Sequence, residues 1–115
     1  RHALMMNRLI YGASAVTHLD ALRWATQGSA RCLGREKLGK IAPGYQADLA
    51  MFTLEELRFS GAGDPLAALV LCGAHRADRV MIRGSWTVKD GMPVGIDVAK
   101  LRHDHGAVAK LFAES

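Results

Sequence analysis

The sequence holds few cysteines and no long apolar run, and each scarcity excludes a class of protein. Only Cys32 and Cys72 occur in 115 residues, and they lie far apart without a pairing pattern. This excludes a small disulfide-stapled domain and predicts a reducing compartment, which we expect to be the cytoplasm. The longest apolar run, residues 66–72, is far too short for a transmembrane helix, so no membrane partner is expected.

Clusters of like charge and aromatic residues are scarce as well. Fifteen Lys and Arg against eleven Asp and Glu leave a net charge of +4, spread along the chain, and only 6% of the residues are aromatic. The densest basic run, residues 31–40, also carries Glu36. Because a nucleic-acid surface requires clustered cations interleaved with aromatic side chains, no nucleic-acid partner is expected. A small basic nucleic-acid-binding protein is only our third hypothesis.

The chain does contain strong helical patterns in its first third. Half of its residues are hydrophobic, enough for a core within one domain at most. Residues 1–11 repeat apolar side chains four positions apart. Thr17 and Asp20 have the spacing of a capping box, and Gly34 would end the helix that follows. Gly28 lies inside this helix, where glycine costs about 1 kcal/mol relative to alanine, so we expect another backbone to pack closely against it.

Residues 38–54 are the stretch around which we expect the fold to be organised. A short strand at Lys40–Ile41 would meet Pro43–Gly44, a pair typical of a type II turn. Residues 47–54 then read as a strand buried on both faces. Asp48 is the only charge in that strand. Its carboxylate is interpreted as an acceptor of backbone N–H groups at the turn, with a metal ligand or general base as the open alternative.

The second half of the chain predicts a short helix, a hairpin and a final helix. Asp64–Pro65 has the N-cap and N1 residues of a helix start. Residues 79–83 and 86–89 alternate apolar and polar side chains, and Gly84–Ser85 would form the turn between these two strands. Asp97 would cap the final helix, which carries an apolar stripe.

Three pairs of residues carry candidate chemistry. His103 and His105 have the His-x-His spacing of a metal site, but on a helix the two rings would lie about 200° apart. Cys72 and His75 resemble half a zinc site, yet no second half-site has suitable spacing. Glu55–Glu56 are adjacent on a turn and would point apart. The residues therefore favour a structural interpretation of all three pairs.

Two motifs rich in small residues lie in the second predicted helix and in the stretch that follows it. They read Ala25-Thr26-x-Gly28-x-Ala30-Arg31-x-Leu33-Gly34 and Gly39-x-Ile41-x-x-Gly44-x-x-Ala47-Asp48-Leu49. Together they resemble the C-terminal region of the amidohydrolase superfamily, in its cytosine-deaminase-like and chlorohydrolase-like branch. Three further segments are similar to the 8-oxoguanine deaminases within that branch: Phe59-Ser60-Gly61, Asp64-Pro65-Leu66-Ala67-Ala68-Leu69 and Asp78-Arg79-Val80-Met81-Ile82-Arg83-Gly84.

The resemblance implies an α+β segment of a larger enzyme. Residues 1–36 would be the last helices of a metal-dependent (β/α)8 hydrolase barrel, the TIM-barrel architecture. Residues 37–95 would be the C-terminal part of a small composite β-sandwich domain. Residues 96–115 would form a C-terminal helix that packs on the barrel.

The resemblance also implies a chemistry for the parent enzyme. It would be a deaminase that hydrolyses an exocyclic amino group of a purine-like ring such as 8-oxoguanine. One divalent metal, zinc or iron, would lower the pKa of a bound water that attacks the ring and expels ammonia. The metal-binding and proton-transfer motifs of the family lie upstream. The resemblance therefore assigns no catalytic, substrate-binding or metal-binding residue here, and the segment alone is expected to be structural and inactive.

The sequence starts at Arg1 without an initiator methionine and already inside a helical pattern, so we expect that the chain was processed or that it is part of a longer polypeptide. Its expected partners are the remainder of that polypeptide and a heterocyclic substrate, and homo-oligomerisation is left open. The sequence does not decide among 8-oxoguanine, guanine, cytosine-like and triazine rings. The alternative hypothesis is a stand-alone interaction module without catalysis, because an apolar strand and three amphipathic helices in a short chain are also typical of such a module.

Overall fold

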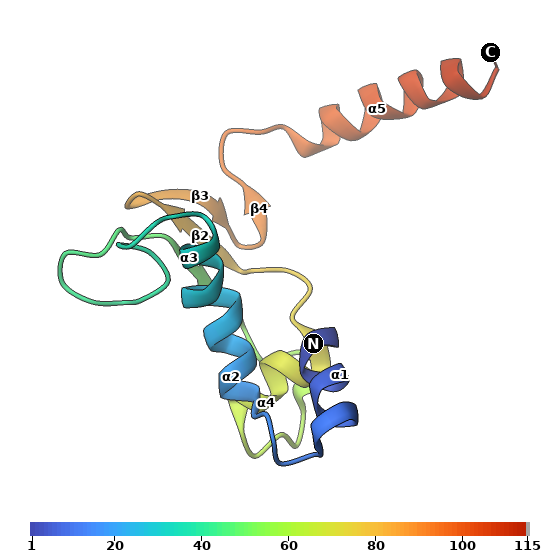
Figure 1. The fold of residues 1–115 in the computed structure, drawn as a ribbon. Coiled ribbons are helices and arrows are strands. Elements are labelled where there is room, and N and C mark those ends of the chain that lie inside the picture. Colours follow the sequence, from blue (N-terminus) through green and yellow to red (C-terminus); the bar gives the residue numbers. More distant parts are fainter. Residues whose placement is uncertain (115) are drawn as a thin grey trace.

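The computed structural model describes residues 1–114 as a helical region, an antiparallel sheet and a terminal helix that projects away from both (Figure 1). The helical elements are α1 (His2–Tyr11), α2 (His18–Arg23), η1 (Trp24–Gly28), α3 (Ser29–Cys32), η2 (Leu57–Phe59), α4 (Pro65–Ala68), η3 (Leu69–Gly73) and α5 (Val98–Ala113). The strands are β1 (Leu49–Met51), β2 (Arg79–Ile82), β3 (Ser85–Lys89) and β4 (Met92–Pro93). The expected mixture of helices and strands is therefore confirmed.

The second helix is continuous from α2 through η1 to α3, with a π turn at η1. Its predicted capping box is confirmed, because the Thr17 hydroxyl accepts the N–H of Asp20 while the Asp20 carboxylate accepts the N–H of Thr17. At the other end Gly34 has φ +64°. The N–H groups of Gly34 and Arg35 donate to the carbonyls of Arg31 and Ala30, a Schellman motif that satisfies the last carbonyls of the helix.

The close backbone approach predicted at Gly28 occurs instead at Gly39, which lies against Thr26 and Gln27 of η1. A methyl group at Gly28 would lie at least 3.6 Å from the nearest atoms, which belong to the same helix. At Gly39, in contrast, it would lie 2.8 Å from the carbonyl oxygen of Thr26 and 2.9 Å from the backbone of Gln27. The loop after α3 therefore lies directly on the η1 backbone, and Gly39 makes this possible.

The strand predicted at Lys40–Ile41 is wrong, because the backbone there follows the contact of Gly39 with η1 and does not pair. The predicted Pro43–Gly44 turn is confirmed: Gly44 has φ +79°, and the N–H of Tyr45 donates to the carbonyl of Ala42 at 3.1 Å. The apolar strand predicted over residues 47–54 is shorter, since only β1 pairs with a neighbour.

The four strands form an antiparallel sheet in the order β1-β2-β3-β4. Ile82 pairs with Ser85, so the β2–β3 turn is Arg83–Gly84 and the predicted turn at Gly84–Ser85 is wrong by one residue. Arg83 has φ +51° and Gly84 φ +81°. Positive φ at both central residues is the requirement of a type I′ turn, whose twist matches that of the flanking strands.

Few apolar side chains are buried by the described part of the chain. Leu4 is fully buried, and Ala30, Phe59 and Ala68 are nearly so. Large apolar side chains are exposed on α1, around β1 and on α5, among them Met5, Met6, Leu9, Ile10, Met51, Phe52, Leu101, Val108 and Leu111. The described residues therefore leave β1 and both terminal helices largely uncovered. Within residues 1–114, no helix has the combination of length and apolar composition that membrane crossing requires.

Replacing Gly39 by alanine tests the contact between the loop and η1. The added methyl group would meet backbone atoms and also force alanine to φ +80°, so we expect a loss of about 3 kcal/mol in the free energy of unfolding. Gly44→Ala is the matched control, because it has the same sign of φ but open space, and should lose only about 1 kcal/mol. Equal losses in urea unfolding would contradict the close approach.

Candidate functional site

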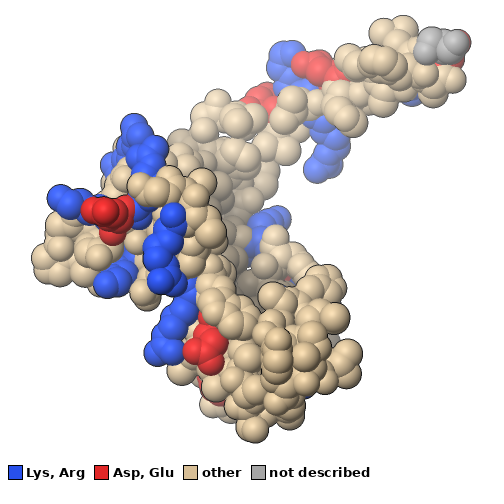
Figure 2. Space-filling model, in the orientation of Figure 1, with Lys and Arg blue, Asp and Glu red and all other residues tan. Residues whose placement is uncertain are grey.

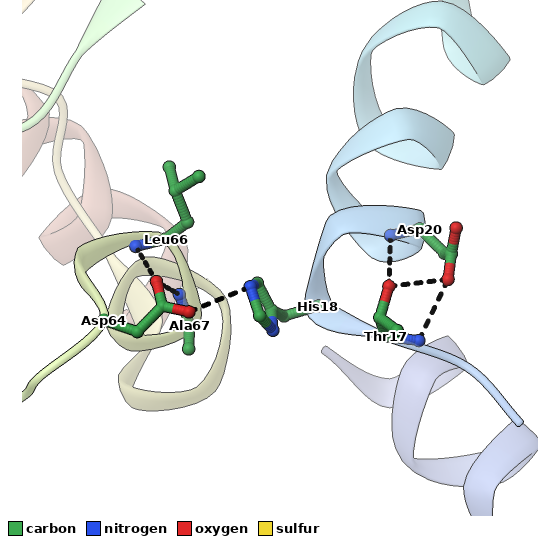
Figure 3. A network of polar contacts seen from close by, with 6 residues as sticks. All are labelled: Thr17, His18, Asp20, Asp64, Leu66 and Ala67. Atoms are coloured by element: carbon green, nitrogen blue, oxygen red, sulfur yellow. Dashed lines mark hydrogen bonds and ion pairs between the residues drawn. The ribbon is translucent and has the colours of Figure 1, made fainter. Parts of the chain in front are cut away.

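A polar network joins the start of α2 to the start of α4 (Figure 3). His18 Nε2 lies 3.2 Å from Asp64 Oδ2, and the other carboxylate oxygen of Asp64 accepts the N–H groups of Leu66 and Ala67 at 2.9 and 3.0 Å. The predicted N-cap at Asp64 is thereby confirmed. The carboxylate thus caps α4 and contacts the imidazole of α2 at the same time, which ties the two helix starts together.

The other half of the network lies within the first turn of α2. The Thr17 hydroxyl donates to Asp20 Oδ2 at 2.6 Å (Figure 3). The guanidinium of Arg23 donates to Asp20 Oδ1 at 3.1 Å. These bonds, the Thr17 hydroxyl first, hold the pKa of Asp20 below its ordinary value. The N–H of Ala67, followed by that of Leu66 and the charge of His18, likewise lowers the pKa of Asp64.

This arrangement stabilises structure and does not present a reactive group. Both oxygens of each carboxylate already accept hydrogen bonds or contact a nitrogen of a neighbouring side chain. A lowered pKa makes a carboxylate a weaker base, whereas a general base at neutral pH requires a raised one. The network is therefore a helix-joining contact, and the sequence indicated only its two caps, not the His18–Asp64 pair between them.

Asp48 serves the β2–β3 hairpin. Its Oδ1 accepts the N–H of Arg83 at 2.7 Å, and the neighbouring carbonyl of Ala47 accepts the N–H of Gly84 at 3.1 Å. The interpretation of Asp48 as an acceptor of backbone N–H groups is confirmed, but the turn concerned is the hairpin turn and not Pro43–Gly44. The bond holds Arg83 in its left-handed conformation, which ordinary side chains disfavour.

The remaining sequence candidates lie apart from one another. His103 and His105 are both on α5, as predicted, and Asp104 between them binds Lys100 at 2.6 Å. Cys72 lies in η3 and His75 in the following loop. Over residues 1–114 no group of three His, Cys, Asp or Glu side chains is placed to hold a metal ion. The described residues therefore do not fit the metal that the family resemblance implies.

The Glu55–Glu56 pair makes only local contacts. Glu56 binds the guanidinium of Arg58 at 2.5 Å, and the N–H of Glu55 donates to the Thr53 hydroxyl. Both glutamates are exposed.

An apolar groove between the helices is a concave feature that sequence reasoning missed. We call it the inter-helix groove; its volume is about 460 Å³, and Arg1 lies at one side of it. Most of its lining is apolar and comes from α2, η1, η3 and the residue after β1: Ala21, Leu22, Ala25, Leu69, Val70 and Phe52. The apolar periodicity of both helices was the available signal, but it could not reveal that a hollow separates them.

Removal of the Asp48 carboxylate tests its role in the hairpin. We expect Asp48→Ala to lower the free energy of unfolding by about 1–2 kcal/mol, because the Arg83 N–H loses its acceptor in a disfavoured conformation. Asp48→Asn keeps an acceptor oxygen and should lose less. Asp104→Ala, whose carboxylate binds only a lysine side chain, is the control and should change stability by less than about 0.5 kcal/mol. Equal effects of Asp48→Ala and Asp104→Ala in urea titrations would contradict this role.

The pH dependence of stability tests the network at α2 and α4. Because the folded-state pKa values of Asp20 and Asp64 lie below the ordinary value of 3.8, both carboxylates stabilise the fold above that pH. This stabilisation is lost as the pH falls below 3.8 through the folded-state values. The double variant Asp20→Asn/Asp64→Asn should therefore show a shallower acid decrease of its melting temperature than the unmodified protein. Identical slopes would rule out the proposed contribution of the network.

Comparison with known sequences places the chain in a family. Residues 1–87 match the model of the amidohydrolase family. The chain is 59% identical over 109 residues to 8-oxoguanine deaminase of Pseudomonas aeruginosa, covering 95% of this chain and 24% of that protein. It is 33% identical to an isoxanthopterin deaminase from an unknown prokaryotic organism, over 78% of this chain and 19% of the relative.

Solved structures give the same result. An adenosine deaminase from Xanthomonas campestris with bound zinc superposes with a TM-score of 0.85 at 26% identity, over 98% of this chain and 26% of that one. The zinc complex of an atrazine chlorohydrolase from Arthrobacter aurescens TC1 has a TM-score of 0.74 at 31% identity, over 93% and 23%. The chain spans about a quarter of the length of these relatives. The resemblance found in its motifs is thus confirmed, and the chain belongs to the amidohydrolase family.

Proposed function

We propose that this chain is the C-terminal part of a metal-dependent aminohydrolase that removes an exocyclic amino group from a purine-like ring, with 8-oxoguanine as the substrate. The observation that carries this proposal is the 59% identity to an 8-oxoguanine deaminase, well above the 33% to the isoxanthopterin deaminase. Identity to a 5-methylthioadenosine/S-adenosylhomocysteine deaminase of Desulfitobacterium hafniense is lower still, at 31%. The names of all three relatives describe deamination of a nitrogen heterocycle, which supports the reaction class.

In this proposal the chain contributes structure and not catalysis. Residues 1–36 supply the last helices of the barrel, residues 37–95 part of a composite β-sandwich, and residues 96–115 a helix that packs on the barrel. The exposed apolar side chains support this division, since Leu101 on α5 is 58% exposed and Val108 is 51% exposed. Large exposed apolar patches are typical of surfaces that another polypeptide segment covers.

The distribution of charged side chains supports the proposal that another part of the polypeptide covers the surface over α1. Figure 2 shows Lys and Arg gathered over the segment between α3 and β1, whereas the face over α1 is almost entirely uncharged in this view. On α1, Leu9 and Ile10 are exposed. We therefore propose that the remainder of the polypeptide covers the α1 side, and that the basic segment between α3 and β1 is exposed to solvent.

The proposed metal is a single divalent ion, zinc or iron, held by residues outside this chain. Zinc is named in the adenosine deaminase and atrazine chlorohydrolase structures, which supports a divalent metal in the parent enzyme. Because the described residues hold no suitable ligand cluster, no catalytic step is assigned to them. We further propose a cytoplasmic enzyme, since both Cys32 and Cys72 are unpaired thiols in the structure.

The alternative of a stand-alone interaction module is weaker. A module that folds by itself must bury enough apolar surface to offset its conformational entropy. Here the described residues bury only Leu4, Ala30, Phe59 and Ala68, and leave two helices and a strand uncovered. The nucleic-acid hypothesis gains no further support, because the basic segment lacks a row of aromatic residues.

Expression of the complete polypeptide that contains this sequence tests the proposal. Its mass should be about four times the 12.4 kDa of the chain, because the chain spans 24% of its relative. We expect it to release ammonia from 8-oxoguanine faster than from guanine or cytosine, and to lose this activity when a chelator removes its metal. The separately expressed chain should release none. Absence of activity on every ring, with the metal bound, would reject the proposed reaction.

A further inference from the structure

We propose that a pocket at the end of α3 binds a phosphate-bearing small molecule, an inference that does not depend on the proposed substrate. We call it the basic pocket, and its volume is about 290 Å³. The lining residues that carry the argument come from η1, α3 and the loop after α3: Gln27, Arg31, Arg35, Glu36, Lys40 and Tyr45. Ligand pockets typically have volumes of about 300–1,000 Å³, so a pocket of this size suits a ligand of one or two phosphate groups.

The basic pocket has an excess of positive charge that nothing in the described chain neutralises. Arg31, Arg35 and Lys40 line it together with a single carboxylate, that of Glu36. Within residues 1–114 none of these three cations forms an ion pair, and Glu36 pairs with no cation. Figure 2 shows the resulting concentration of Lys and Arg over this segment. Because like charges around one pocket repel each other, an anion bound between them would be favoured.

The other arginines of the helical region hold structure, and those of the basic pocket do not. Each of the others donates to a carbonyl or a carboxylate, as Arg8 does at 2.8 Å and Arg23 at 3.1 Å. At the end of α3 the Schellman motif already satisfies the last carbonyls of the helix. The guanidinium groups of Arg31 and Arg35 donate no hydrogen bond within the described part of the chain, so they are available to a ligand.

The loop that forms one wall of the basic pocket is held closed without a ligand. The N–H of Gln46 donates to the carbonyl of Lys37 at 2.9 Å, which brings the two ends of the loop together, and Gly39 lies on η1. Inside the loop the ammonium group of Lys40 lies 5.5 Å from the centre of the Tyr45 ring. Compact loops with close ends are frequently functional. Since this wall is already formed, a ligand would not have to order it.

The donors of the basic pocket match phosphate in particular. A guanidinium group presents a planar fork of N–H donors that can bind two phosphate oxygens at once, and two such groups are present, on Arg31 and Arg35. The half-buried side-chain amide of Gln27, which has no hydrogen-bond partner among the described residues, can donate to a further oxygen. A neutral purine ring would leave these charges without partners, so this ligand is distinct from the proposed substrate.

Calorimetric titration of the complete polypeptide with pyrophosphate at low ionic strength tests this inference. We expect saturable binding of one pyrophosphate per chain, weakened by added salt. Arg31→Gln and Arg35→Gln should each weaken this binding at least about fivefold, because each removes charge-assisted hydrogen bonds. Arg102→Gln is the matched control, since it removes the same charge from α5, which projects away from the pocket (Figure 1), and should leave the affinity unchanged. Arg35→Lys, which keeps the charge but not the fork, should recover part of the affinity.

Four results would overturn the inference. Absence of saturable binding at millimolar pyrophosphate would mean that the basic pocket takes no phosphate. Equal weakening by Arg31→Gln and Arg102→Gln would show only a general attraction of the net charge. Binding that neither Arg31→Gln nor Arg35→Gln weakens would place pyrophosphate elsewhere, for example on the metal of the parent enzyme. Binding to phosphatidylglycerol vesicles or single-stranded RNA that pyrophosphate does not displace would identify a different kind of surface.

The titration measures binding and requires no turnover, so its failure is distinguishable from failure of the proposed function. A protein that binds pyrophosphate through Arg31 and Arg35 but deaminates no ring would reject the proposed function and leave the basic pocket intact as an anion site.

Discussion

Packing of α2 against α1, α4 and η3 holds the helical region together, and the side chain of Leu4 on α1 is fully buried. Each of these helices is short, and short helices are marginal in water unless a neighbour covers their apolar face. The described chain satisfies this requirement on one side of each helix only. The sheet needs such coverage even more than the helices do. Strand β1 pairs with β2 along one edge only, and the nearby side chains of Met51 and Phe52 remain exposed.

Local polar bonds give the elements their shape where burial is sparse. Thr17 caps the start of α2, aspartates cap α4 and α5, and a Schellman motif ends α3. The carboxylate of Asp48 accepts the N–H of Arg83, 35 positions later in the chain, and so stabilises the hairpin turn. Bonds of this kind fix where an element starts and stops, but each contributes modestly to net stability. The chain therefore has well-formed elements and a small core.

Sequence reasoning predicted the features whose cause is local. Thr17, Asp64 and Asp97 cap helices because their side chains reach N–H groups within three residues, and this spacing is visible in the sequence. The turn at Arg83–Gly84 was placed one residue late, because an arginine at positive φ is held by a distant aspartate that no local pattern reveals. The family motifs were recognised from their glycine and aspartate spacing.

The candidate site likewise combines features that local sequence predicts with features that depend on distant residues. Its caps follow from local spacing, but the His18–Asp64 contact and the inter-helix groove arise only when two helices meet. The sequence predicts close packing at Gly28 inside a helix, whereas the structure has the close backbone approach at Gly39 in a loop. A loop glycine gives no such signal, since glycine is ordinary in loops. These features depend on tertiary contacts, which composition and hydrophobic periodicity do not predict.

Strand β1 lies at one edge of the sheet and pairs with β2 on one side only. An open strand edge beside exposed Met51 and Phe52 is a template for pairing with other chains. At high concentration this edge would therefore favour self-association of the chain through intermolecular strand pairing.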